Sequence, residues 1–84
     1  MVTDAQKSLY HIGIDTIRNN IMTGKLDSMK AITDFIYTYF EEHKMMEVYE
    51  IGYGRAYMER DALDYYIIYC EVYRKIPVSG YAED

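Results

Sequence analysis

Hydrophobic residues recur at helical spacing in the first quarter of the chain. The recurring positions are Tyr10, Ile14, Ile17 and Ile21. Steps of three or four residues place side chains on one face of a helix. Thr3 and Gln6 have the spacing of a capping box at its start, and Gly24 is a natural terminator at its end. The pattern therefore predicts a helix over residues 4–22.

A second hydrophobic segment follows after a short link. Its broad apolar face consists of Met29, Ile32, Phe35, Ile36, Tyr39 and Phe40. Asp27 is a suitable N-cap, and Leu26 and Ala31 then occupy the two positions of a hydrophobic staple. We expect a helix over residues 27–44. The short link of residues 23–26 favours an antiparallel hairpin between this helix and the first.

Residues 45–56 have no clear period. Val48, Tyr49 and Ile51 suit either a helix or a short strand, whereas Gly52 and Gly54 interrupt both. The segment is predicted to be a loop or a short fourth element, with a turn over residues 51–55.

The last hydrophobic segment combines two opposing signals. Residues 65–73 read YYIIYCEVY, and these residue types favour strands. The charged residues, however, fall at helical intervals, and they are Arg60, Asp64, Glu71 and Lys75. Tertiary packing routinely overrides the strand propensity of individual residues, so we give more weight to the helical spacing of the charged residues. We therefore predict a helix over residues 57–76. It would carry the ion pairs Arg60–Asp64 and Glu71–Lys75.

The whole pattern predicts an all-α fold with three or four helices and an N-terminal antiparallel helical hairpin. Pro77 ends the last helix, and residues 77–84 are expected to be frayed. With 84 residues the chain has room for one domain, residues 1–84. The alternative is an α+β fold whose C-terminal β-hairpin pairs residues 46–57 with residues 65–76.

The charge of the chain changes the choice of partner. The net charge is −5, and acidic residues are concentrated between residues 41 and 64. Such a surface repels a phosphate backbone, so direct nucleic-acid binding is not expected, whereas a protein with a basic surface is favoured. The sequence contains neither a membrane-spanning run nor a secretory signal, so a cytoplasmic protein is expected.

Motifs for catalysis or for metal binding are absent from the sequence. It contains no nucleophile elbow, P-loop or HExxH motif. His11 and His43 fall toward opposite ends of the predicted hairpin, so we expect no metal site and no cofactor. Cys70 is the single cysteine, which excludes an internal disulfide, and it is expected to fill the core.

Tyrosine is the strongest compositional signal, with 11 residues and no tryptophan. Tyrosine is enriched where proteins bind one another. A partner-binding surface is therefore predicted on the glycine-containing loop and the last helix, near the acidic residues. Its candidate residues are Tyr49, Tyr53, Arg55, Tyr57, Asp61, Asp64, Tyr65 and Tyr69.

These observations favour a non-enzymatic, acidic protein-binding factor. We expect an inhibitor or regulator, encoded by a phage or mobile element, that covers a basic site on a host protein. In length and charge the chain is similar to nuclease-immunity proteins, although no motif aligns with them. A bacteriocin immunity protein or antitoxin is thus an alternative.

Two further hypotheses come from other classes. A small-ligand protein, for instance one that binds a nucleotide, would use Tyr10, His11, Lys25 and Arg55, because aromatic rings stack on bases and cations attract phosphate. A structural protein would instead form a homodimer or larger oligomer through the tyrosine-rich helix.

Overall fold

The computed structural model describes residues 2–45 and 52–74, which contain three α-helices. They are α1 (Asp4–Met22), α2 (Met29–Glu42) and α3 (Arg55–Val72). Within these two ranges there is no strand, so the predicted all-α class is confirmed. Most of the predicted fourth element, residues 46–51, and the predicted frayed tail lie outside the described residues.

Local capping explains why α1 has the predicted limits. The Thr3 side chain accepts a hydrogen bond from the backbone N–H of Gln6, and the Gln6 side chain accepts one from the N–H of Thr3. At the other end Gly24 has a φ of 83°, and its N–H donates to the carbonyl of Ile21. Lys25 N–H donates to the carbonyl of Asn20, which completes a Schellman motif.

The start of α2 differs from the prediction. Ser28, not Asp27, is the N-cap, and its hydroxyl accepts a hydrogen bond from the N–H of Ala31 at 3.1 Å. The Asp27 carboxylate instead pairs with Arg74 at the end of α3. With Ser28 as the cap, Leu26 and Ala31 are no longer at the two positions of a hydrophobic staple. The prediction of the cap and staple was therefore wrong.

Residues 65–72 are helical, so the alternative β-hairpin is wrong for this part of the chain. The buried residues of α3 explain the outcome, because Met58, Ala62 and Cys70 recur at helical spacing and face the core. The helix begins at Arg55, after a turn in which Gly52 has a φ of 101°. It ends at Val72, short of the predicted limit at residue 76.

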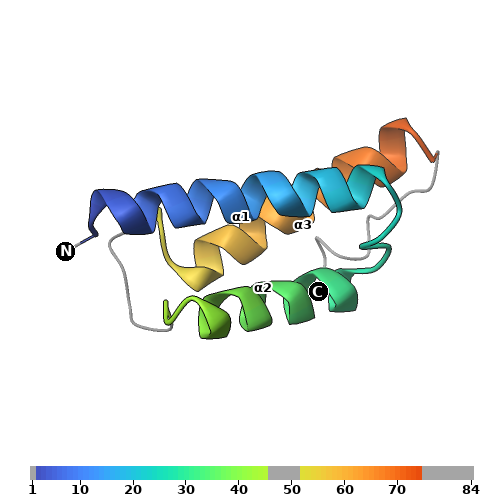
Figure 1. The fold of residues 1–84 in the computed structure, drawn as a ribbon. Coiled ribbons are helices and arrows are strands. Elements are labelled where there is room, and N and C mark those ends of the chain that lie inside the picture. Colours follow the sequence, from blue (N-terminus) through green and yellow to red (C-terminus); the bar gives the residue numbers. More distant parts are fainter. Residues whose placement is uncertain (1, 46–51, 75–84) are drawn as a thin grey trace.

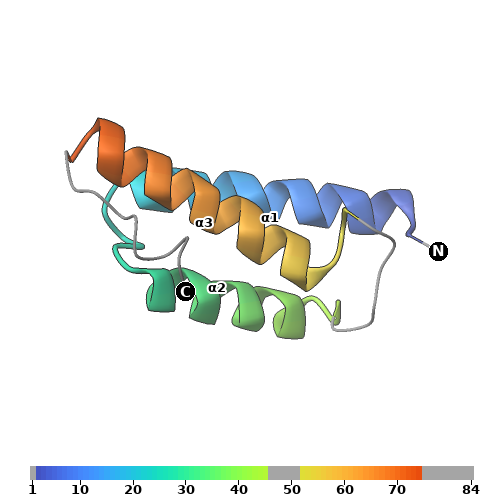
Figure 2. The same cartoon turned by 180° about the vertical axis from the view of Figure 1, so that it is seen from behind.

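The helix α3 joins the other two. Figure 1 shows α1 and α2 running in opposite directions, with α3 behind them, and the reverse view in Figure 2 has α3 in front. Both α1 and α2 pack more extensively on α3 than on each other. The predicted N-terminal hairpin is therefore not confirmed as the packing unit, because most of the packing of α1 and α2 is against α3.

The core lies where the three helices meet. Its fully buried side chains include Ile17, Ile21, Ile32, Ile36, Phe40, Met45 and Met58. Gly13 of α1 marks the closest approach, because a Cβ there would lie 2.8 Å from Tyr39 Cε2 and 2.9 Å from Met58 Cε. The hydroxyl of Tyr39 donates to the carbonyl of Leu9 at 2.6 Å and so ties α2 to α1.

Candidate functional site

The candidate site is the side of α3 opposite its buried residues Met58, Ala62 and Cys70. Positions 57, 61, 64, 65, 68, 71 and 72 recur at helical spacing and share this side of the helix. The residues at these positions are Tyr57, Asp61, Asp64, Tyr65, Ile68, Glu71 and Val72. We call this set the outer face of α3. In the view of Figure 2, α3 lies in front of its two neighbours.

The N-terminal half of the outer face is held against α1. The hydroxyl of Tyr10 donates to Asp61 Oδ2 at 3.2 Å. Tyr65 lies under the Arg18 guanidinium, 5.8 Å from its ring centroid. Burial, and then the neighbouring Asp61 carboxylate, raises the pKa of Tyr10 above its ordinary value of 10.0. These contacts position Asp61 and Tyr65 and leave them half-buried.

An aromatic cluster joins α1 to the turn that precedes α3. The rings of Tyr10, His11 and Tyr53 meet edge to face, with centroids 5.4–5.9 Å apart. Lys7 Nζ lies 5.7 Å from the centroid of the Tyr53 ring. This geometry is typical of aromatic packing between helix and loop. The cluster therefore attaches the turn before α3 to α1.

The basic side chains of Arg55 and Arg60 contact neighbouring tyrosine rings or carboxylates. The Arg60 guanidinium lies 4.8 Å from the centroid of the Tyr57 ring, and its Nε is 3.9 Å from Asp61 Oδ1. Arg55 lies over the ring of Tyr37 on α2, at 5.7 Å. The predicted Arg60–Asp64 ion pair is thus not formed. The other predicted ion pair includes Lys75, which lies outside the described residues.

The two exposed carboxylates of α3 have no cationic partner among the residues that the structure describes. Asp64 and Glu71 are exposed, and neither makes an ion pair or a hydrogen bond with another residue that the structure describes. They lie seven residues apart and therefore on nearly the same side of the helix. Their negative charges face solvent on either side of Ile68.

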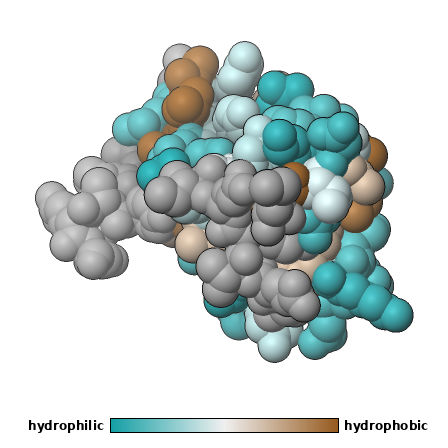
Figure 3. All heavy atoms as spheres, turned by 90° about the vertical axis from the view of Figure 1, so that its left-hand side faces the viewer, coloured by the Kyte–Doolittle hydropathy of each residue, from teal (hydrophilic) through white to brown (hydrophobic). Residues whose placement is uncertain are grey.

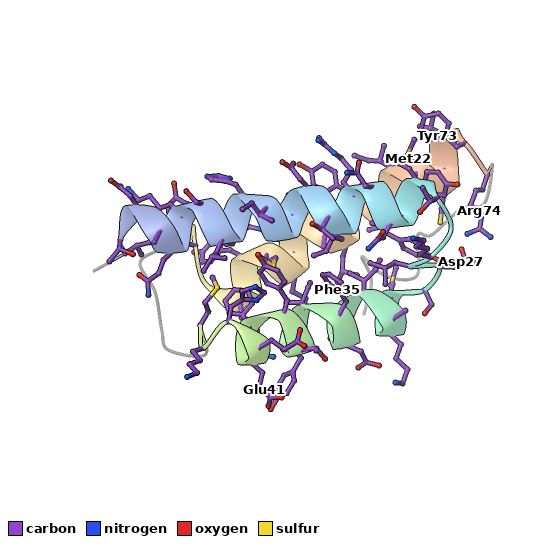
Figure 4. The ribbon with its side chains drawn as sticks, viewed as in Figure 1. Met22, Asp27, Phe35, Glu41, Tyr73 and Arg74 are labelled. Carbon is purple, nitrogen blue, oxygen red and sulfur yellow. The ribbon has the colours of Figure 1, made fainter. Side chains whose placement is uncertain are left out.

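The C-terminal half of the outer face is apolar and exposed. Ile68 is 56% exposed and Val72 is 52% exposed, and the two are one helical turn apart. Met22 and Tyr73, also exposed, lie at the same end of the molecule, where α1 and α3 finish (Figure 4). The opposite end has a mainly hydrophilic coloured surface with separated hydrophobic spots (Figure 3). Four exposed large hydrophobic residues therefore lie toward the end where α1 and α3 finish, whereas Ile12 on α1 and Tyr37 on α2 are exposed elsewhere.

Contacts beyond the outer face fix the end of α3. Arg74 pairs with Asp27 in the link between α1 and α2, and the hydroxyl of Tyr66 donates to the Asp27 carbonyl at 3.1 Å. Burial raises the pKa of Tyr66, with a further contribution from its hydrogen bond to Cys70. Cys70 is buried, as expected.

The structure brings together half of the predicted partner-binding residues. Tyr57, Asp61, Asp64 and Tyr65 share the outer face of α3. The other described candidates lie elsewhere: Tyr53 packs on α1, and Arg55 covers Tyr37 of α2. Tyr69 and Tyr65 both pack against the core, but Tyr69 lies farther from the outer face on the helix. Tyr49 lies outside the described residues.

Sequence reasoning missed Ile68, Glu71 and Val72 as candidates. Helical spacing from Asp64 would have placed all three beside it. Their exposure could not be read from that spacing, because it depends on where α1 and α2 cover α3. The tyrosine count directed attention to the aromatic residues instead.

The predicted small-ligand residues are not gathered into one site. Tyr10 and His11 are in contact, with ring centroids 5.8 Å apart. Lys25 lies in the link that follows α1, whereas Arg55 begins α3 at the opposite end of the bundle (Figure 1). A pocket of about 310 Å³ is lined by Ala56, Tyr57 and Arg60. The Arg60 guanidinium lies over the Tyr57 ring there, where a base would have to stack.

Three searches bear on the nature of the site. In residues 2–45 and 52–74, side chains that could hold a metal ion do not form groups of three or more. None of the helices formed by these residues is long and apolar enough to cross a membrane. Comparison with known proteins finds no matching family model, no similar curated protein and no similar solved structure.

Proposed function

We propose that the protein is a non-enzymatic binding factor that covers a basic site on another protein. The observation that supports this most is that exposed apolar side chains and exposed carboxylates lie side by side on the outer face of α3. Apolar area provides affinity between proteins, and complementary charge provides specificity and fast association. A face that served stability alone would not need both features exposed.

The charge distribution favours a protein over a nucleic acid as the partner. The chain has a net charge of −5, and the cations near the outer face, Arg18 and Arg60, lie over tyrosine rings. A phosphate backbone would meet the exposed carboxylates of Asp64 and Glu71 and be repelled. A lysine- or arginine-bearing surface would be attracted by the same groups.

A binding role is also more consistent with the tyrosines than a catalytic role. Tyr10, Tyr39 and Tyr66, the tyrosines with a raised pKa, use their hydroxyls to join one helix to another or to the link between them. These hydroxyls therefore have structural partners. We extend the proposal to an inhibitor or regulator encoded by a phage or mobile element and acting in the host cytoplasm. An immunity protein or antitoxin would use the same kind of surface.

The test is capture of partners from a bacterial lysate with two variants of matched charge. Asp64→Lys with Glu71→Lys reverses the outer face of α3. Glu41→Lys with Glu42→Lys makes the same charge change on exposed residues at the end of α2, where Glu41 points outward (Figure 4). We expect a specific basic protein to bind the wild type and the α2 variant and to be lost with the α3 variant. Recovery of no specific protein by the wild type would contradict the proposed function.

A nucleotide-binding role has weaker support, because its candidate residues lie at different ends of the bundle. Thermal unfolding in the presence of nucleotides distinguishes the two roles. We expect no nucleotide to raise the unfolding temperature. Stabilisation by one of them that is lost in Tyr57→Leu would favour the pocket beside Arg60 instead.

A further inference from the structure

We propose that the C-terminal half of the outer face of α3 is a docking site for a basic amphipathic helix of a partner protein. The inference rests on the proposed function and identifies the surface and the chemistry of its occupant. The site consists of Asp64, Ile68, Glu71 and Val72. We call these four residues the docking stripe.

The spacing of the docking stripe suits a helix as the occupant. Asp64, Ile68 and Val72 follow one another at intervals of four residues, and Glu71 lies three residues after Ile68. Side chains at such intervals form a ridge that inclines across the helix surface. A second helix can lay an apolar ridge of its own beside it and contact Ile68 and Val72 together. The stripe spans about two helical turns, which is long enough to select a helical partner.

Unlike the rest of the outer face, the docking stripe makes no ion pair or ring contact with another residue that the structure describes. Asp61 is engaged by Tyr10 and Arg60, and Tyr65 by Arg18. By contrast, Ile68 and Val72 are each more than half exposed. An incoming helix therefore reaches the stripe without displacing any ion pair or ring contact of the described residues. Met22 and Tyr73 are also exposed at this end of the molecule (Figure 4).

Charge complementarity selects the class of occupant. The exposed carboxylates of Asp64 and Glu71 flank the exposed Ile68, so a partner residue that touches Ile68 brings its neighbours close to both charges. Lysine or arginine at those neighbouring positions would form ion pairs beside an apolar contact. A second copy of this chain would instead add the same carboxylates and a second net charge of −5. Anionic lipid would be repelled for the same reason.

The experiment uses the full chain and a defined probe. The probe is a fluorescently labelled leucine–lysine peptide of about 14 residues, roughly four helical turns, with leucine on one face and lysine on the other. A peptide of identical composition in scrambled order has no apolar face and serves as the first control. We expect the amphipathic peptide to bind with micromolar affinity in fluorescence anisotropy, and the scrambled peptide to bind about tenfold more weakly.

Two isoleucines of equal exposure provide the matched variants. Ile68 lies in the docking stripe and Ile12 on the outward side of α1, and each is 56% exposed. Ile68→Gln should weaken peptide binding about tenfold, because an apolar contact at the centre of an interface is lost. Ile12→Gln should change it less than about twofold. Circular dichroism should show the same helix content for both variants, since neither side chain belongs to the core.

The charge contribution has its own pair of variants. Asp64→Asn with Glu71→Gln should weaken binding about fivefold and reduce its dependence on salt. Glu41→Gln with Glu42→Gln removes the same charge elsewhere and should have little effect. Equal effects of the two isoleucine variants, equal binding of the scrambled peptide, or no binding of the amphipathic peptide would overturn the inference.

These outcomes are separable from failure of the proposed function. If a specific protein is still captured from lysate while Ile68→Gln leaves that capture unchanged, the docking site is wrong and the binding function remains. Light scattering provides one further outcome. A dimer that Ile68→Gln dissociates would show that a second copy occupies the stripe, which would also overturn the inference.

Discussion

The inner and outer faces of α3 both carry large apolar side chains, but the surroundings of these side chains differ. On the inner face Met58 and Ala62 are fully buried, and the Tyr66 hydroxyl has a backbone partner. On the outer face Ile68 and Val72 are exposed, and Asp64 has no cation among the residues that the structure describes. The comparison indicates that the inner face provides stability, whereas the outer face is available for binding.

The largest expected difference between the faces is in the cost of removing an apolar side chain. Met58→Ala should lower the free energy of unfolding by about 2–5 kcal/mol, because it leaves a cavity in the core. Ile68→Ala should change it by less than about 0.5 kcal/mol, because the side chain is exposed. Urea unfolding at neutral pH measures both values. Similar losses in the two variants would show that Ile68 belongs to the core.

Adding a methyl group to α1, where it meets the inner face of α3, should also destabilise the protein. Alanine is favoured over glycine in a helix by about 1 kcal/mol. At Gly13, however, the new Cβ would lie less than 3 Å from side-chain atoms of Tyr39 and Met58. The Tyr39 ring is also held in place, because its hydroxyl donates a hydrogen bond to the Leu9 carbonyl. Overpacking costs about 1–3 kcal/mol, so Gly13→Ala should be destabilising by about 1 kcal/mol in urea unfolding. A stabilised variant would contradict the close packing of the three helices.

A hydrogen bond from α1 contacts the N-terminal half of the outer face of α3. Tyr10→Phe removes the hydroxyl that donates to Asp61 and should cost about 1 kcal/mol in urea unfolding. Tyr37→Phe, on the exposed side of α2, is the control and should cost less than about 0.5 kcal/mol. An equal cost for both variants would mean that the Tyr10–Asp61 contact does not stabilise the fold.

The same hydroxyl should make stability depend on alkaline pH. In the unfolded chain Tyr10 titrates near its ordinary pKa of 10.0, whereas burial and Asp61 raise its pKa in the folded protein. Above pH 10 the unfolded chain therefore loses a proton that the folded protein keeps, and stability falls as pH rises. Tyr39 and Tyr66 have raised pKa values and act in the same direction.

The contribution of Tyr10 to this pH effect needs a variant to isolate it. Urea midpoints measured from pH 9 to pH 11 should fall for the wild type. The fall should be smaller in Tyr10→Phe, which lacks the titrating group. Identical pH profiles for the two proteins would contradict the assignment to Tyr10.

Parts of the fold were predictable because they depend on local sequence. The limits of α1 follow from the capping box of Thr3 and Gln6 and from the terminating Gly24, which are all neighbours in sequence. The start of α2 was not predictable in the same way, because Asp27 and Ser28 are both good caps. Only the distant Arg74, which pairs with Asp27, distinguishes them.

Part of the candidate site was also predictable from local sequence. Helical period alone places Tyr57, Asp61, Asp64 and Tyr65 on one face. Tyr69 and Tyr53 were assigned to that surface by residue type, but long-range packing places them against the core and α1. The exposure of Ile68 and Val72 also depends on the positions of the other helices. Tertiary contacts of this kind cannot be read from one helix.

We propose that the outer face of α3 binds a basic helical partner. Amide NMR of the uniformly labelled chain tests this binding most directly. Titration with the amphipathic leucine–lysine peptide should shift the amide resonances of Asp64, Ile68, Glu71 and Val72 most strongly. The resonances around Ile12 should move little. Shifts centred on α2 or on the outward side of α1, or spread evenly over the protein, would contradict the claim.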